Sequence, residues 1–122
     1  MNTTSSPVDT YCVIGNPVAH SRSPWIHARF AELTGQALTY ERRLVPLDTF
    51  TTGLRSFIAR GGRGCNVTVP FKFEAAAVAQ HLSPRAALAQ AANTLSLRAD
   101  GIHADNTDGA GLVADIARNA GL

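Results

Sequence analysis

The sequence predicts an α/β fold: a mostly parallel twisted sheet with one antiparallel hairpin and helices on both faces. Short apolar runs alternate with segments whose apolar residues recur at helical spacing, and this alternation is typical of α/β domains. The two-residue turn signal Asp100-Gly101 stands between two strand-like runs and predicts the hairpin. With 122 residues, 45% of them apolar, the chain can bury one domain-sized core.

Residues 1–9 read as a polar tail, and a first strand is predicted over residues 11–14, where a Gly-Asn-Pro turn ends it. A helix follows, with Ser23 placed as its N-cap and a proline at its first position. The helix has an apolar stripe at i, i+4, i+7 spacing, formed by Ile26, Phe30 and Leu33. Gly35 ends it.

A second strand over residues 38–45 is rich in Arg and Glu, which favours the edge of the sheet. Asp48 is expected to cap the next helix, and the glycines of residues 61–64 break that helix. A third strand is predicted over residues 65–69, where a proline ends it. The apolar face of the helix between these strands consists of Phe50, Leu54, Phe57 and Ile58.

A short alanine-rich helix follows Lys72, and Ser83-Pro84 starts another. Strands over residues 93–98 and 102–104 form the predicted hairpin. A final helix is predicted from about Asp108 to Asn119. Its inward-facing residues are Leu112 and Ile116.

The composition argues against several classes of function. The net charge of +2 comes from scattered basic residues, so we expect no nucleic-acid partner. The longest fully apolar run, residues 75–79, is far too short for a transmembrane segment, so we expect no membrane partner. The N-terminus lacks the features of a signal peptide, and Cys12 and Cys65 read as buried free thiols. These two observations favour a cytoplasmic location.

Three polar segments stand at predicted strand ends, where open α/β sheets bind their ligands. The first is residues 21–24, Ser-Arg-Ser-Pro. A helix cap at Ser23 is a sufficient structural reason for it, but two hydroxyls beside the free amides of a helix N-terminus also suit a carboxylate. The two interpretations are compatible, because a capped terminus still has unpaired N–H groups.

The second segment spans residues 66–72, in which alternation puts Asn66 and Thr68 on one face of a strand. Both faces of a buried parallel strand should be apolar, so this polar face suggests a ligand; the alternative is hydrogen bonding to neighbouring loops. The chain's single lysine, Lys72, follows directly, although a lone lysine at a turn is more often solvated than catalytic.

The third segment is residues 105–109, where Thr107 could cap a helix and Asp108 could complement its dipole. A calcium loop is rejected because its twelfth position would be Ile116. A loose Gly-x-Gly pattern over residues 109–114 follows a polar turn rather than a buried strand and predicts no dinucleotide site. The four histidines show no metal-ligand spacing with either cysteine, so no metal site is expected.

Taken together, four segments in this order resemble shikimate dehydrogenase, and the resemblance runs from about Tyr11 to the C-terminus. It implies the NADP-dependent, reversible reduction of 3-dehydroshikimate to shikimate, on the pathway to aromatic amino acids. Residues 10–122 would be the N-terminal substrate-binding domain. The matching segments are Gly15–Pro24, Asn66–Lys72, Ala92–Thr94 and Asp105–Gly109.

The family also has a C-terminal Rossmann domain that binds NADP(H), and the resemblance places that domain outside this chain. No cofactor-binding residue is therefore expected here, and the isolated chain should have little or no dehydrogenase activity. The domain face that would meet the missing part is a candidate surface for self-association.

The resemblance assigns catalysis to Lys72 and Asp108. Lys72 would be the acid/base, because an ammonium at a ketone oxygen stabilises the charge that hydride transfer creates and supplies a proton. Asp108 would pair with Lys72 and, together with Asn93, hold the ring hydroxyls of the substrate.

The remaining assignments concern substrate binding. Ser21 and Ser23 would hold the substrate carboxylate with the help of Thr68, and Asn66 would shape the pocket. Two alternatives stay open: a quinate/shikimate enzyme, which could use NAD, and a non-catalytic module that binds shikimate-like molecules. The interpretation of the chain as a purely structural domain does not explain why the four motifs occur together.

Overall fold

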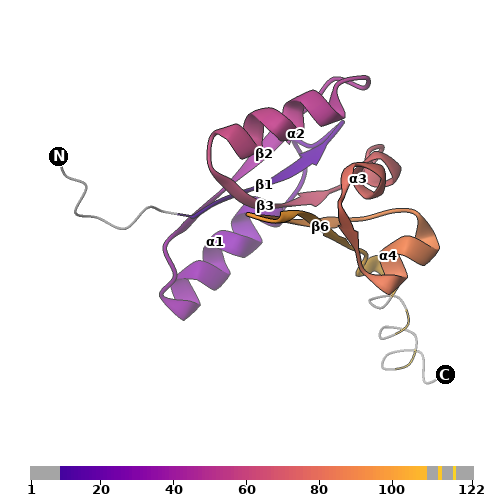
Figure 1. The fold of residues 1–122 in the computed structure, drawn as a ribbon. Coiled ribbons are helices and arrows are strands. Elements are labelled where there is room, and N and C mark those ends of the chain that lie inside the picture. The colour runs from indigo at the N-terminus through magenta and orange to yellow at the C-terminus, as the bar shows by residue number, and fades with distance from the viewer. Residues whose placement is uncertain (1–8, 110–112, 114–116, 118–122) are drawn as a thin grey trace.

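The computed structural model describes residues 9–109 together with Val113 and Ala117. One six-stranded sheet, in the order β2-β1-β3-β5-β6-β4, forms the frame of the molecule (Figure 1). The elements are β1 (Asp9–Gly15), α1 (Ser23–Thr34), β2 (Leu38–Leu44), α2 (Phe50–Ala59), β3 (Gly62–Val67), α3 (Lys72–Val78), β4 (His81–Leu82), α4 (Pro84–Ala89), β5 (Thr94–Arg98) and β6 (Gly101–Asp105).

The sheet confirms the predicted α/β class. β1 pairs in parallel with both β2 and β3, and β4 pairs in parallel with β6. Strand β5 runs the other way, antiparallel to β3 and to β6. The predicted hairpin is present, but its two-residue turn is Ala99-Asp100, one position earlier than predicted, and Gly101 begins β6 with a φ of +127°. The charged strand β2 lies at the sheet edge, as its sequence indicates.

The main core lies on the face of the sheet that α2 and α3 cover, while α1 lies on the opposite face (Figure 1). Phe50 of α2 stacks on Phe71, which precedes α3, at 5.3 Å between ring centroids. Each fully buried Phe or Leu contributes about 1.5–3 kcal/mol through burial. The predicted apolar face of α2 is therefore confirmed, except that Ile58 is 36% exposed. Cys12 and Cys65 are buried and free, as expected.

Helix α1 departs from the prediction in two ways. Its N-cap is Arg22, and the Ser23 amide donates instead to the side chain of Ser21. The expected apolar stripe points away from the sheet: Phe30 is 59% exposed and Leu33 67%. Only small Ala31 is buried among the residues of α1, because this helix meets the sheet through its Ala31 side rather than its most apolar side. Gly35 closes the helix with a φ of +70°, as predicted.

Other element ends shift by a few residues. Thr49 rather than Asp48 precedes α2, with no side-chain cap. Strand β3 begins at Gly62 and ends at Val67, earlier at both ends than the predicted 65–69. Ser83 caps α4 as expected, accepting the Ala86 amide at 3.1 Å. Asp108 and Gly109 are helical, but most of the predicted last helix, including Leu112 and Ile116, lies outside the described residues.

Asp105, the last residue of β6, joins α4 to the loop that follows the strand. Its Oδ1 accepts from the Ser83 hydroxyl and from Nε of Arg85, each at 2.7 Å, while Oδ2 accepts from the Arg85 guanidinium at 2.7 Å. The same carboxylate accepts the Asn106 amide. The Arg85 contact, followed by that of Ser83, holds the pKa of Asp105 well below its ordinary value. Within the described residues, no helix is long and apolar enough to cross a membrane.

The burial pattern predicts a contrast between two helical leucines. Leu54 in α2 is fully buried, whereas Leu88 in α4 is 89% exposed. We expect Leu54→Ala to lower the free energy of unfolding by about 2–5 kcal/mol, because it removes buried contacts and leaves a cavity. Leu88→Ala should change it by no more than about 0.5 kcal/mol. Urea unfolding measures both variants, and equal effects would contradict the placement of the core.

The Asp105 cluster predicts a pH-dependent contribution to stability. A carboxylate whose pKa is lowered by folding stabilises the folded state above its unfolded value, near 3.9, and this contribution fades as the pH falls further. We expect Asp105→Asn to be less stable than the parent chain at pH 7, with the difference shrinking from pH 5 towards pH 2. Thermal unfolding across that range is the measurement. The exposed Asp48→Asn is the control, and a difference independent of pH would contradict the assignment.

Candidate functional site

A polar cavity of about 360 Å³ lies where β1 and β3 end. All of the site residues predicted from the sequence line this cavity, which we call the polar pocket, although they come from four separate segments. They are Ser21, Ser23, Asn66, Thr68, Lys72, Asn93 and Asp108. The structure therefore brings together the whole predicted set, while the role of each residue stays a prediction.

Lys72 and Asp108 form an ion pair at the pocket. Nζ of Lys72 donates to Oδ2 of Asp108 at 2.7 Å, and Nδ2 of Asn93 donates to Oδ1 of the same carboxylate at 3.0 Å. The side chains of the pair are 31% and 52% exposed. Half-exposed pairs stabilise a fold by at most about 1 kcal/mol. The pair's main effect is thus to hold an ammonium in a defined place at the pocket wall.

Asn93 has a fixed orientation because both ends of its amide are engaged. Oδ1 accepts the backbone amide of Thr107 at 3.0 Å, while Nδ2 donates to the Thr107 hydroxyl at 2.9 Å as well as to Asp108. The Asp108 amide is itself held by Oδ1 of Asn106 at 3.0 Å. Asn106 donates to the backbone oxygen of Ala91 at 3.1 Å, so it ties the two loops together. The sequence reasoning assigned Asn106 no role, although an Asn between two aspartates in a turn could have suggested one.

The serine loop is held from the sheet edge. Nε and a terminal nitrogen of Arg42, on β2, donate to the backbone oxygen of Ser21 at 3.0 and 2.6 Å. Because the Ser21 side chain accepts the Ser23 amide, both hydroxyls lie at the N-terminus of α1. Arg42 is a second contributor that the sequence reasoning missed. No local pattern could have indicated it, because its partner is 21 positions away.

Asn66 is oriented by an aromatic pair behind the pocket. The Tyr40 hydroxyl donates to Oδ1 of Asn66 at 2.6 Å, and the His27 ring stacks on Tyr40 at 4.3 Å between centroids. Burial raises the pKa of Tyr40, which keeps the phenol protonated and able to donate. The Tyr40 hydroxyl thus engages the side-chain oxygen of Asn66, a residue that lines the polar pocket.

Thr68 stands next to β1 because Gly15 has no side chain. A Cβ on Gly15 would overlap Cγ2 of Thr68, so only glycine permits this close approach. The Thr68 amide donates to the backbone oxygen of Ile14 at 2.9 Å, which extends the pairing of β1 and β3 into the pocket wall.

The resulting wall is rich in hydrogen-bond donors. It offers one ammonium, the hydroxyls of three Ser or Thr residues, and side-chain amides, with a single carboxylate already engaged by Lys72. Such a lining suits a small, oxygen-rich anion. Lys72 and His20 carry the basic nitrogens of this lining, the groups able to pass a proton to a bound oxygen atom.

Comparison with known proteins identifies the family. Residues 13–95 match the family model described as shikimate dehydrogenase substrate binding domain. The chain is 68% identical over 123 aligned positions to shikimate dehydrogenase (NADP(+)) of Paracidovorax citrulli, covering 100% of this chain and 43% of that protein. For the enzyme of the same name from Verminephrobacter eiseniae the identity is 71%, over 93% of this chain and 40% of that protein. The chain thus spans about two-fifths of the length of these relatives.

Solved structures agree with the sequence matches. The Ael1 enzyme from Pseudomonas putida superposes with a TM-score of 0.86 at 44% identity, covering 93% of this chain and 42% of that one. Shikimate 5-dehydrogenase from Thermus thermophilus, solved in complex with NADP(H) and shikimate, superposes with a TM-score of 0.84 at 33% identity, covering 93% and 43%. The match of the family model to most of this chain, together with these relatives, shows that the chain belongs to the shikimate dehydrogenase substrate-binding domain family.

Proposed function

We propose that this chain binds shikimate and 3-dehydroshikimate for an NADP-dependent shikimate dehydrogenase and supplies the acid/base group of the reaction. The observation that carries the proposal is the convergence of four sequence segments on one polar pocket that contains the Lys72–Asp108 pair. The names of the relatives and the shikimate bound in the Thermus thermophilus structure support this substrate class.

The carboxylate of the substrate is proposed to bind at the start of α1. Ser21 and Ser23 supply hydroxyls there, and the first amides of this twelve-residue helix add partial positive charge. Thr68, which directly follows β3, lines the same pocket and adds a third hydroxyl. These hydroxyl and amide donors carry no formal charge, yet they can bind a carboxylate. The ammonium of Lys72 is therefore left for the other end of the substrate.

The reacting oxygen is proposed to lie against Lys72. When bound, NADPH supplies a hydride to the ketone carbon, and electron density then accumulates on the oxygen. Nζ of Lys72 stabilises this oxygen and donates a proton to it, which yields the hydroxyl of shikimate; the reverse reaction returns the proton to the lysine. Asp108 holds the ammonium by its 2.7 Å hydrogen bond, and both Asp108 and Asn93 are placed to bind ring hydroxyls.

The cofactor is proposed to bind to a part of the enzyme beyond residues 1–122. Relatives more than twice as long as this chain are named as NADP(+) enzymes, and we assign NADP to their additional C-terminal domain. By itself the chain is therefore proposed to bind substrate with little or no turnover. A cytoplasmic location and self-association through the open domain face stay predictions.

A non-catalytic binding module is the competing function. Such a module would have the same carboxylate site but would make no use of an acid/base lysine. A quinate/shikimate enzyme is the other alternative, and it would differ in the substrate that it accepts. Titration with shikimate, 3-dehydroshikimate and quinate, followed by kinetics of a full-length enzyme carrying this domain, separates the three.

The carboxylate site can be tested on this chain directly. We expect calorimetric titration with shikimate to show saturable binding, weakened at least about tenfold in a Ser21→Ala/Ser23→Ala double variant, because hydrogen bonds to charged groups are worth about 1.5–3 kcal/mol each. Ser56→Ala, an exposed serine of α2, is the matched control. Circular dichroism verifies folding. Unchanged affinity in the double variant would rule out these serines as the carboxylate site.

A test of the catalytic role of Lys72 requires measurable turnover, and therefore a full-length enzyme that carries this domain. We expect Lys72→Ala to lower kcat by about 10²–10⁴-fold, the usual contribution of a positioned acid/base group, with a much smaller change in KM. Arg55→Ala, on the exposed side of α2, is the control. If kcat stays near that of the parent while KM rises, Lys72 has a binding role instead.

A further inference from the structure

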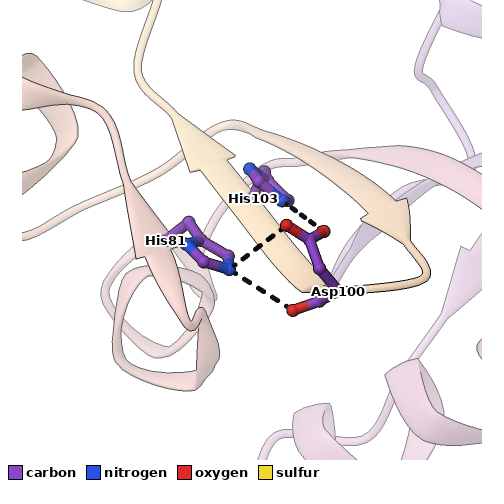
Figure 2. Close-up of side chains that lie close together, drawn as sticks. All are labelled: His81, Asp100 and His103. Atoms are coloured by element: carbon purple, nitrogen blue, oxygen red, sulfur yellow. Dashed lines mark hydrogen bonds and ion pairs between the residues drawn. The ribbon is translucent and has the colours of Figure 1, made fainter.

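Two histidines that are far apart in the sequence lie side by side in the sheet. His81 of β4 and His103 of β6 are register partners in a parallel pair, so their side chains leave the sheet on the same face. The rings stack with 4.2 Å between centroids and 18° between planes. Figure 2 shows both rings facing Asp100, the second residue of the Ala99-Asp100 turn that leads into β6.

The nitrogens of both rings converge on one carboxylate. Nε2 of His103 lies 2.8 Å from Oδ1 of Asp100, and Nε2 of His81 lies 3.6 Å from Oδ2 and 3.3 Å from the backbone oxygen of the same residue (Figure 2). One ligand atom from each residue can be chosen so that all three lie within 4.8 Å of one another. The hydrogen bond from His103 lowers the pKa of Asp100, so this carboxylate is ionised at neutral pH.

The backbone around the cluster is held in place by Gln80, the residue before His81. Its amide donates to the backbone oxygen of Ile102 at 3.1 Å, and its Oε1 accepts the Ile102 amide at 2.7 Å. Gly101 lies so close to this side chain that a Cβ there would stand 2.8 Å from Oε1. The turn that carries Asp100 is therefore fastened to the segment that carries His81, and the three side chains are arranged before any ligand arrives.

This donor set has the chemistry of a transition-metal site. Zinc binds imidazole nitrogen at about 2.0–2.1 Å and carboxylate oxygen at about 2.0–2.2 Å, so tetrahedral ligands stand about 3.3–3.5 Å apart. The two donor separations of 2.8 and 3.6 Å lie on either side of that spacing. Two imidazoles with one carboxylate favour Zn²⁺, Co²⁺, Ni²⁺ or Cu²⁺ over Mg²⁺ or Ca²⁺, which prefer oxygen ligands only.

We propose that His81, Asp100 and His103 form a binding site for one divalent transition-metal ion of the Zn²⁺ type. A cavity of about 360 Å³ adjoins both histidines and has room for water as a fourth ligand. The metal takes the place of the Nε2 protons that now face oxygen atoms of Asp100, so binding releases protons and weakens as the pH falls. The bound ion links β4 to the β5–β6 hairpin. This site shares no residue with the polar pocket and does not depend on the proposed function.

The test is calorimetric titration of the untagged chain with Zn²⁺ at pH 7.5. We expect one Zn²⁺ per chain, released by EDTA, and affinity at least about tenfold lower in His81→Ala and in His103→Ala, because even residues that only support a metal ligand are commonly worth that much. His20→Ala, an exposed histidine outside the cluster, is the matched control. Co²⁺ in place of Zn²⁺ should give the visible absorption of a tetrahedral site in the parent chain and in His20→Ala, but not in His81→Ala or His103→Ala.

The variants are chosen so that a folding defect cannot imitate the result. All three side chains are partly exposed, so the substitutions should leave the circular dichroism spectrum unchanged. Asp100→Asn preserves the size of the turn residue while removing its charge, and it should also weaken Zn²⁺ binding. Shikimate titration of the His81→Ala, His103→Ala and Asp100→Asn variants should match that of the parent chain. Binding that does not saturate, or that is as strong in a His81→Ala/His103→Ala double variant as in the parent, would overturn the proposal.

Discussion

The parallel pairing of β1 with β3 is the constraint on which the polar pocket depends. Its register places Ile14 opposite Val67, so both strands end at the same edge of the sheet. Backbone hydrogen bonds continue the pairing past the strand ends, from the Thr68 amide to Ile14 and from the Asn16 amide to Val69. The serine loop that follows β1 and the turn that precedes Lys72 must therefore leave the sheet side by side.

The reversed strand β5 brings the other two segments to that edge. Because β5 is antiparallel to β3, it begins where β3 ends, and Asn93 stands at this beginning, with its backbone oxygen accepting the Val67 amide at 2.8 Å. Strand β6 reverses direction again and ends beside Asn93, which delivers Asp105 and the loop with Asp108. A single reversed strand, β5, thus collects four sequence segments around one cavity. The same reversal creates the Asp100 turn at the opposite end of the hairpin, where His81 and His103 meet.

The two faces of the sheet differ in how they are covered. Large aromatic residues fill the side of α2 and α3, whereas α1 contacts the other side through small Ala31 and leaves Phe30 and Leu33 exposed. A cavity of about 670 Å³ lies beside α1 on that second side, lined in part by Tyr11, Asn66 and Ser96. In the core, Cys12 and Cys65 are register partners of β1 and β3, and the side-chain contact with Cys65 together with burial raises the pKa of Cys12, which is therefore a neutral packing residue.

Most secondary-structure elements could be predicted because their signals are local. Gly35 ends a helix, Ser83-Pro84 starts one and Asp100-Gly101 marks a hairpin whose turn lies at Ala99-Asp100, since each depends on the conformational range or hydrogen bonding of a few neighbouring residues. Caps were less predictable where several Ser, Thr or Asp residues compete. At α1 the hydrogen bond to Ser21 displaced the expected cap at Ser23, and at α2 the helix begins one residue later than a cap at Asp48 would require.

The sequence by itself determined the α/β class, the family and the composition of the polar pocket, because four ordered motifs carry that information without coordinates. Only the tertiary structure decided which face of α1 meets the sheet, because helical periodicity defines a stripe but not the partner that covers it. The structure also decided the contacts that span the chain: Arg42 with Ser21, Tyr40 with Asn66, and His81 with His103. These pairs join residues about 20 or more positions apart, and strand pairing in three dimensions, rather than local pattern, sets such distances.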